Sequence, residues 1–202
     1  MAGALKSGLE HFGLESFLAH EDISPSSNWL RTIRKSLRNC HVFMPILTNA
    51  FKESNWTDQE TGFAVALKKV ILPIKVDLLP YGFITEVHAQ KMPKHMNAGA
   101  CWRIVKNLAN HPSLRNDVLD SFISVCSHSR SFDQSAENFE YLIELAPFSA
   151  EQIKSLLEGA IRNRQVYESY GAQRVLERLM REHDDAEIPR GLVTRYHRKV
   201  AR

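Results

Sequence analysis

The sequence is short of the residues that build disulfide frameworks, metal clusters and membrane spans. Its three cysteines are widely spaced and form no C-x-x-C pair, which argues against a disulfide framework and against a cysteine-rich zinc site. No stretch approaches the roughly 18 uninterrupted apolar residues of a spanning helix, and the first residues lack the apolar segment of a signal peptide. These absences predict a cytoplasmic protein with no membrane segment.

Patterns for metal and phosphate sites are also missing. The nine histidines show no H-E-x-x-H motif or other paired-ligand spacing, and no glycine-rich loop is present to cradle a phosphate. The hydrophobic fraction of 44% and the charged fraction of 24% are those of an ordinary globular protein. We therefore expect a folded protein without a metal site.

Positive charge gathers at the end of the chain, although the net charge is only +3. Residues 1–90 carry as many acidic as basic side chains, and no acidic residue follows Glu187. The basic residues of the last fifteen positions are Arg190, Arg195, Arg198, Lys199 and Arg202. A short basic terminus is typical of a solvated end, so nucleic acid is not an expected partner. The alternative is contact of this tail with RNA, DNA or acidic lipid.

The first residues have the spacing of a helix followed by a short strand. Leu5, Leu9 and Phe12 recur every three or four residues, and Gly13 follows as the residue type that most easily closes a helix. Residues 16–20 have the composition of a short strand. The chain therefore opens inside a helix and then turns into a sheet.

A second helix and an apolar run come next. The loop at residues 24–27 is expected to supply the N-cap of a helix that buries Trp29, Ile33 and Leu37. Residues 42–47 are almost continuously apolar, which is typical of a strand covered on both faces in a parallel sheet.

The following segments complete an alternating pattern of strands and helices. Pro45 cannot donate a ladder hydrogen bond, so a bulge or local irregularity is expected within that strand. Residues 58–69 have helical spacing, and residues 70–76 form a third apolar run. This order predicts right-handed crossovers and a doubly wound parallel sheet with helices on both faces.

The strand pattern ends after residue 82, and helical stripes with capping residues follow. Ser149 and Gln152 have the spacing of a capping box at a helix start. The stripes lie at residues 102–108, 118–125, 139–145, 153–161 and 175–180. We predict an α/β domain over residues 1–90 and an all-helical accessory region over residues 91–202. Antiparallel helical pairs of about 35 residues are one option for that region.

Trp56 and Glu60 are the strongest candidates for chemistry. An i, i+4 pair lies on one helix face, so the indole and the carboxylate point the same way. The pair follows the strand at residues 42–47, and α/β folds bind ligands at the carboxyl ends of their strands. A carboxylate shielded by tryptophan can stabilise positive charge on a sugar as a glycosidic bond breaks. Without further support, packing and a helix-dipole partner are the more common roles of such residues.

Several segments resemble, in order, those of the prokaryotic TIR (Toll/interleukin-1 receptor) domains. They are SFLAHEDI at 16–23, NW at 28–29, CHVFMPILT at 40–48, SNWTDQETG at 54–62 and the run at 70–77. The resemblance covers about residues 1–90 and implies a flavodoxin-like sheet. It also implies an activity, because NAD-cleaving members convert NAD to nicotinamide and ADP-ribose or a cyclic isomer without a metal or other cofactor.

The resemblance assigns roles to individual residues. The glutamate of the W-x-x-x-E motif is catalytic in NAD-cleaving members, which implies a catalytic Glu60 and makes Trp56 a pocket wall. Thr48 stands where the family commonly has serine, so a hydroxyl is retained in the substrate site. The loop that gates the pocket and mediates assembly maps to residues 20–27, in which His20 and Asp22 are expected to contact substrate. The expected assembly residues are Glu21, Ile23, Ser24, Pro25 and Ser26.

The sequence departs from the family pattern at its start. Family members begin with a strand whose following loop lines the NAD site, whereas this sequence begins in the helix after it. In the strand order 2-1-3-4-5 that strand is central, so its loss would leave unpaired backbone groups. Either the protein has a longer start, which we favour, or residues 16–20 pair directly with residues 42–47.

These features favour an NAD glycohydrolase in bacterial signalling or defence. Such an enzyme is expected to self-associate through the TIR domain, or to bind another TIR or sensor protein, while the helical region senses a trigger or drives assembly. The rival interpretation is an interaction module without turnover. A third interpretation, in which the helical half binds nucleic acid or a second protein, depends on the basic tail alone.

Overall fold

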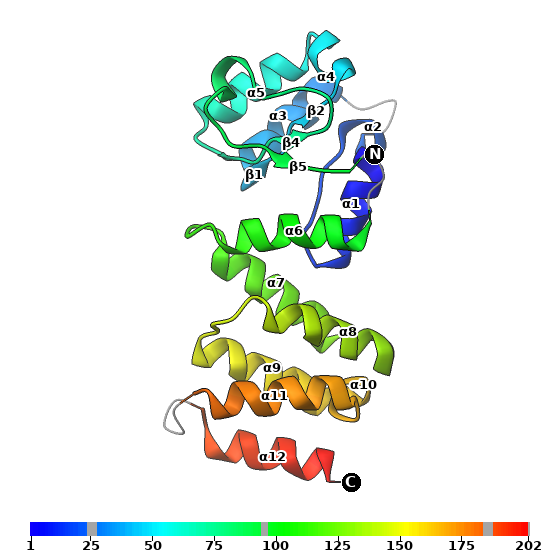
Figure 1. Cartoon of the computed structure of the whole chain (residues 1–202), viewed down its shortest axis with the longest axis vertical. Coiled ribbons are helices and arrows are strands. Elements are labelled where there is room, and N and C mark those ends of the chain that lie inside the picture. The colour runs from blue at the N-terminus through cyan, green and yellow to red at the C-terminus, as the bar shows by residue number, and fades with distance from the viewer. Residues whose placement is uncertain (24–27, 94–96, 184–187, 202) are drawn as a thin grey trace. The chain divides into compact units, whose positions relative to one another are not determined.

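A computed structural model describes residues 1–23, 28–93, 97–183 and 188–201 of the chain (Figure 1). The chain divides into two compact units. The α/β unit comprises residues 1–10 and 15–104, and the helical unit comprises residues 11–14 and 105–202. The predicted domain boundary between residues 90 and 91 stays a prediction, because compactness does not by itself establish independent folding.

The helices of the α/β unit largely follow the apolar spacing of the sequence. They are α1 (Ala2–His11), α2 (Ala19–Asp22), α3 (Trp29–Asn39), α4 (Asn49–Glu53), α5 (Thr57–Ala66), the 3-10 helix η1 (Gly82–Ile84) and the start of α6 (Ala98–Ala109). Leu5 and Leu9 of α1 are buried, and Gly13 has a φ of 81°, as expected for a residue that closes a helix. The predicted first helix is confirmed.

Helix α3 confirms part of the prediction made for it. Ile33 and Leu37 are buried, but the Trp29 side chain is 38% exposed because it stands at the first position of the helix. Asn28 caps the helix, since its side-chain oxygen accepts a hydrogen bond from the Arg31 amide at 3.1 Å. The loop predicted to provide the cap, residues 24–27, lies outside the described residues.

The predicted strand at residues 16–20 is wrong. The Asp22 carboxylate accepts a hydrogen bond from the Leu18 amide at 2.6 Å, and the Asp22 amide bonds to the Leu18 carbonyl at 2.9 Å. These bonds close the turn of α2, so the chain becomes helical at Ala19, and residues 16–18 form no strand. Direct pairing of residues 16–20 with residues 42–47 is therefore wrong as well, and no described strand pairs with the outer side of residues 42–47.

The strands are short and parallel. They are β1 (Val42–Phe43), β2 (Ile46–Leu47), β3 (Val70–Ile71), β4 (Ile74–Lys75) and β5 (Gln90–Lys91). Strand β1 pairs with β3, and β4 lies between β2 and β5. The parallel pairing of the two apolar runs is thus as predicted, while the doubly wound, flavodoxin-like arrangement stays a prediction.

Prolines divide each apolar run into two strands. Pro45 separates β1 from β2, and Pro73 separates β3 from β4, because proline has no amide hydrogen to donate. Pairing nevertheless continues across the gap through the Leu72 amide to the Phe43 carbonyl at 3.0 Å and the Ile74 amide to the Pro45 carbonyl at 2.8 Å. The irregularity predicted at Pro45 is confirmed.

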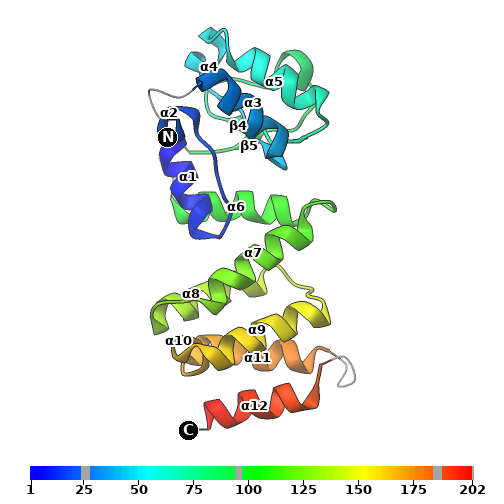
Figure 2. The ribbon, with the colours of Figure 1, turned by 180° about the vertical axis from the view of Figure 1, so that it is seen from behind.

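Helices α3 and α5 cover the β1–β3 pair. Ile33 and Leu37 of α3 and Ala64 of α5 form a buried cluster against which Phe43 and Ile71 of the two strands pack. Figure 2 shows α3 in front of strands β4 and β5. This packing holds α5 through Ala64 near its C-terminal end, and Trp56 and Glu60 lie at the opposite end of the helix.

The helical unit is a two-layered stack of helices. Its helices are the end of α6, α7 (Arg115–Ser127), α8 (Phe132–Ile143), α9 (Ala150–Arg162), α10 (Arg164–Tyr167), α11 (Tyr170–Arg181) and α12 (Arg190–Val200). Helices α7, α9 and α12 pack in that order, and α8 packs against α11 (Figures 1 and 2). The antiparallel helical pairs left open by the sequence are therefore present as α7–α8 and α9–α11.

In this unit the predicted capping box is confirmed, whereas the expectation of a solvated basic terminus is wrong. Ser149 and Gln152 form the predicted capping box at the start of α9. The basic terminus, expected to be a solvated end, is the helix α12, because Leu192 and Tyr196 on one of its faces are buried. Within the described stretches, no helix is long and apolar enough to cross a membrane.

Candidate functional site

Trp56 and Glu60 lie at the beginning of α5. The Glu60 amide donates to the Trp56 carbonyl at 2.9 Å, so the first turn of the helix is closed and the two side chains share a face. Helix α4 is the only regular element between this turn and β2. The turn therefore follows the carboxyl end of a parallel strand, where α/β folds bind their ligands.

The Glu60 carboxylate is half-buried, and no described side chain or backbone group offsets the loss of its hydration. In the described part of the chain its side chain makes no hydrogen bond and no ion pair. Burial alone raises the pKa of the Glu60 carboxyl above its usual value, because partial loss of water disfavours the charged form. A carboxylate held in this way is available to a positively charged ligand.

Trp56 makes an edge-to-face contact with a second tryptophan, Trp29, for which the sequence predicted burial. The rings of Trp29 and Trp56 are 4.6 Å apart between centroids and nearly perpendicular at 89°. The two side chains are 38% and 43% exposed, so both present ring surface to solvent. Sequence spacing assigned Trp29 to the buried face of α3, and no local signal connects it with Trp56 across 27 positions of chain.

Tyr81 links the segment after β4 to the same helix. Its hydroxyl donates a hydrogen bond of 2.9 Å to Oδ1 of Asp58 in the first turn of α5. Partial burial and this hydrogen bond to a carboxylate raise the pKa of Tyr81 to about 12. The ring also lies 6.5 Å from that of Phe51 and 5.9 Å from the Lys52 ammonium. Tyr81 was not predicted, because it stands in a loop without periodicity.

Thr48 and Asp22, two predicted substrate-binding residues, already have protein partners. The Thr48 hydroxyl caps α4 by accepting the Phe51 amide at 3.1 Å. The Asp22 carboxylate accepts the Leu18 amide and forms an ion pair with Lys6 of α1. Both side chains therefore stabilise local structure, and their contact with a substrate stays a prediction.

The predicted assembly loop is described only in part. His20 and Glu21 lie in α2, and the Glu21 side chain is exposed. Ile23 is half-buried and packs against the cluster around Ile33. Ser24, Pro25 and Ser26 lie outside the described residues. Their role in assembly stays a prediction.

A polar hollow of about 320 Å³ occurs in the other compact unit, between α7 and α9. Its lining includes Asp120 and Gln152, whose side chains bond to each other through Nε2 and Oδ1 at 3.0 Å. Gln152 also belongs to the capping box of α9. Asp120 and Gln152 therefore satisfy each other's hydrogen-bonding groups, and the hollow is a weaker candidate for a ligand site than the turn at Glu60.

The described residues contain no preformed metal-binding site. No group of three or more histidine, cysteine, aspartate or glutamate side chains there is close enough to hold an ion. The cysteines are unpaired thiols, and burial raises the pKa of the Cys126 thiol far above its usual value. Cys126 is therefore an inert packing residue at neutral pH.

Comparison with known proteins gives one family. Residues 1–98 match the family model described as TIR domain. No curated protein and no solved structure gives a significant match. The match begins at α1 and includes α5 and the five strands of the described residues.

Proposed function

Because residues 1–98 of this chain are a TIR domain, we propose that this domain cleaves NAD between nicotinamide and ribose, with Glu60 as the catalytic carboxylate. The observation that carries the proposal is the state of that carboxylate. It is half-buried, has a raised pKa, and lacks a cationic or hydrogen-bonding partner in the described residues. Perturbed carboxylates of this kind are found at functional sites more often than elsewhere.

The reaction places positive charge where Glu60 can act. The bond between C1′ of the ribose and the pyridinium nitrogen breaks, and its electron pair leaves with nicotinamide, which becomes neutral. Positive charge then develops on C1′ and the ring oxygen, and a preorganised carboxylate stabilises it. Water adds to C1′ and releases one proton, which gives ADP-ribose. Addition of a nucleophile from the same molecule gives a cyclic isomer instead.

The tryptophan pair would provide the wall of this site. Trp56 shares a helix face with Glu60, and its indole presents apolar surface to a planar ring such as nicotinamide. Trp29 meets it edge to face and restricts the orientation of the Trp56 indole. We therefore assign Trp29 a positioning role.

A product assay on the whole chain tests the proposal. Purified protein is incubated with NAD at several protein concentrations, and nicotinamide, ADP-ribose and cyclic isomers are separated by chromatography and identified by mass. The proposal expects nicotinamide and one ADP-ribose product to form in equal amounts. Unchanged NAD at every protein concentration, including those at which the chain self-associates, would contradict it.

An assembly module without turnover is the second candidate, and exposed aromatic residues favour it. Trp29 and Trp56 contact each other edge to face at the surface, and the Phe83 side chain of η1 is 82% exposed. Phe83 lies over Gly62 of α5, where an added Cβ would come within 3.8 Å of its ring. Large exposed aromatic side chains on neighbouring elements are typical of protein interaction surfaces.

Assembly through the loop at residues 20–27 predicts a coupled loss of oligomers and activity. Ser26→Arg introduces a bulky charge into the loop, so both the oligomer size and the rate of NAD loss per molecule are expected to fall. Light scattering and the product assay, each run over a range of protein concentrations, measure the two quantities. Ser124→Arg, at an exposed position of α7, is the matched control. If both variants behave as the wild type, the loop has no part in assembly.

A further inference from the structure

Charge is divided unevenly within the helical unit. From residue 105 to the end, the sequence has equal numbers of acidic and basic residues, but five of the basic ones and none of the acidic ones follow residue 189. The rest of the unit is therefore acidic, and the segment containing α12 is strongly basic. Charge segregated in this way creates a local positive potential even where the net charge is small.

Three exposed arginines of the preceding helices are neutralised by carboxylates one turn away. Arg162 pairs with Glu158 at 3.0 Å, Arg164 with Glu168 at 2.9 Å and Arg178 with Glu182 at 2.7 Å. Each pair has i, i+4 spacing on its own helix. These exposed arginines therefore contribute little free positive potential.

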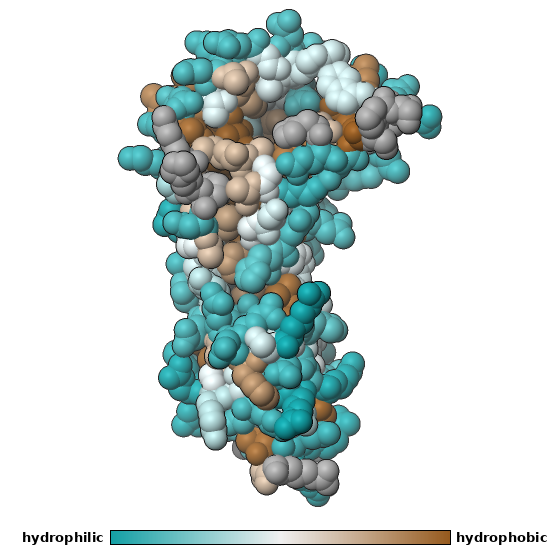
Figure 3. All heavy atoms as spheres, turned by 90° about the vertical axis from the view of Figure 1, so that its right-hand side faces the viewer, coloured by the Kyte–Doolittle hydropathy of each residue, from teal (hydrophilic) through white to brown (hydrophobic). Residues whose placement is uncertain are grey.

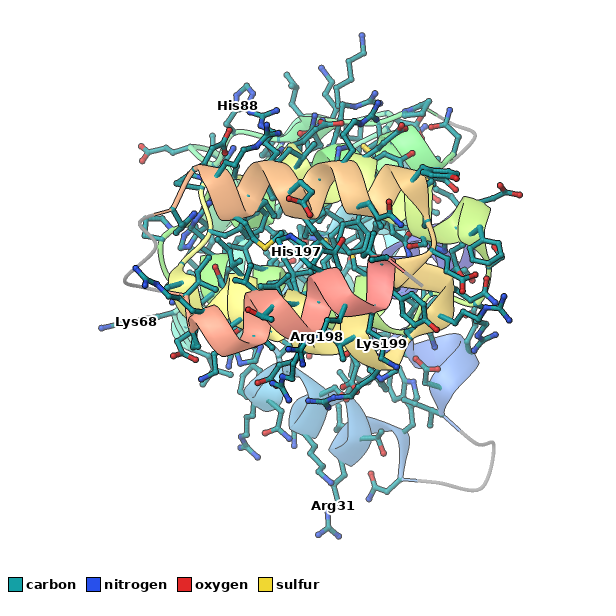
Figure 4. All side chains as sticks on the ribbon, turned by 90° about the horizontal axis from the view of Figure 1, so that it is seen from below. Arg31, Lys68, His88, His197, Arg198 and Lys199 are labelled. Atoms are coloured by element: carbon teal, nitrogen blue, oxygen red, sulfur yellow. The ribbon has the colours of Figure 1, made fainter. Side chains whose placement is uncertain are left out.

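The arginines of α12 are different. Arg190, Arg195 and Arg198 are exposed, and none of them has an acidic partner among the described residues. His197 alone on this helix contacts a carboxylate there, that of Glu177 in α11 at 3.0 Å. Figure 4 shows His197 on the side of α12 that faces α11, with Arg198 and Lys199 on the other side.

Packing holds this basic face in place. Leu192 and Tyr196 of α12 are buried, as is Ile188 just before the helix. The Lys199 ammonium lies 5.5 Å from the ring of Tyr167, which further restricts it. The guanidinium groups are therefore carried by an ordered helix, and a ligand that binds them does not have to order the backbone first.

We propose that the exposed face of α12, defined by Arg190, Arg195 and Arg198, binds the phosphate backbone of a nucleic acid. Guanidinium groups match phosphate in geometry and charge, and contacts of this kind need no base sequence. No large hydrophobic side chain of α12 is exposed, and the face of the helical unit drawn in Figure 3 is mostly hydrophilic. A bilayer surface is therefore the poorer partner, because membrane-bound helices bury an apolar face.

The test compares two triple variants of the full chain. The first variant carries Arg190→Ala, Arg195→Ala and Arg198→Ala. The matched control carries Arg162→Ala, Arg164→Ala and Arg178→Ala, which removes the same charge from arginines with carboxylate partners. Binding to a fluorescent DNA duplex of about 20 base pairs is followed by anisotropy at several salt concentrations, and circular dichroism checks that both variants keep their helices.

The wild type is expected to bind the duplex, and the α12 variant to bind it at least about tenfold more weakly. The slope of log K against log salt concentration should fall by about two to three, at roughly 0.9 for each phosphate that an arginine no longer neutralises. The control variant should stay within about threefold of the wild type, since the partner carboxylates already cancel most of the positive potential of those arginines. A parallel sedimentation assay with phosphatidylserine vesicles tests the membrane alternative. Three outcomes would overturn the proposal: no binding of the duplex by the wild type at low salt, equal losses in the two variants, or binding to the vesicles without binding to the duplex.

Discussion

Replacement of Glu60 by glutamine is expected to abolish nicotinamide release from NAD while leaving the fold intact. Glutamine keeps the shape of the side chain but removes the charge that stabilises the positively charged sugar, and loss of one preorganised electrostatic group typically costs about 10²–10³ in kcat. Rates of nicotinamide release by the wild type and by Glu60→Gln measure this effect. Glu53→Gln, which removes an exposed carboxylate from α4, is the control and should retain full activity.

The same substitution is expected to raise the thermal stability of the protein at neutral pH. The pKa of Glu60 is raised by burial, so the folded state holds the proton more tightly than the unfolded state does. Charged Glu60 therefore lowers the free energy of unfolding as the pH rises above its unfolded pKa of about 4.3. Glutamine removes this cost, and the difference in melting temperature should vanish in acid. A variant that is both inactive and less stable than the wild type at pH 7 would show that Glu60 supports the fold instead.

Replacement of Phe12 by alanine is expected to lower the free energy of unfolding by about 3–5 kcal/mol, the usual cost of truncating a buried phenylalanine. The Phe12 side chain is 1% exposed. Its ring lies edge to face with those of Phe122 and Tyr141, at centroid distances of 5.6 and 5.4 Å. Phe12 thus belongs to the core of the helical unit, although it lies within the segment that matches the TIR family.

Urea unfolding followed by far-ultraviolet circular dichroism measures the effect of Phe12→Ala. The matched control is Phe17→Ala, because Phe17 is 44% exposed and its truncation leaves no cavity. The control should differ from the wild type by less than about 0.5 kcal/mol. Equal losses in the two variants would show that Phe12 does not pack in a core.

The helical elements were largely predictable because their signals are local. Apolar spacing located α1, α3 and α5, and the capping box located the start of α9. Helix α12 escaped prediction because only Leu192 and Tyr196 of its residues are both apolar and buried, while arginine and lysine dominate the rest. Val193 and Val200 extend the apolar spacing, but the basic residues Arg190, Arg195, Arg198 and Lys199 among them give the segment the composition of a solvated end.

The strands were predictable only where both faces are apolar. Residues 42–47 and 70–76 carry that signal, and they pair in parallel as expected. Gln90 and Lys91 form β5 through backbone hydrogen bonds to β4, and polar side chains gave no indication of it. Residues 16–20 have the composition of a strand, but the Asp22 carboxylate captures the Leu18 amide and turns the chain into a helix.

The candidate site was predictable to the extent that it depends on one helix. The spacing of Trp56 and Glu60 determines that they share a face of α5. Two contacts join segments far apart in the chain, so no local pattern predicts them. They are the edge-to-face contact of Trp29 with Trp56 and the hydrogen bond from Tyr81 to Asp58. The raised pKa of Glu60 is also a tertiary property, because it comes from burial.

The pH dependence of NAD cleavage tests most directly whether Glu60 acts as a carboxylate. Nicotinamide release by the wild type is measured as kcat/KM across the acid range, where the profile reports the groups of the free enzyme. Activity is expected to fall as the pH decreases, with a midpoint above about 4.3, the ordinary pKa of glutamate, and Glu60→Gln should leave no measurable acid limb. A wild-type rate that stays constant through this range, or an identical profile in Glu60→Gln, would contradict a catalytic role of the Glu60 carboxylate.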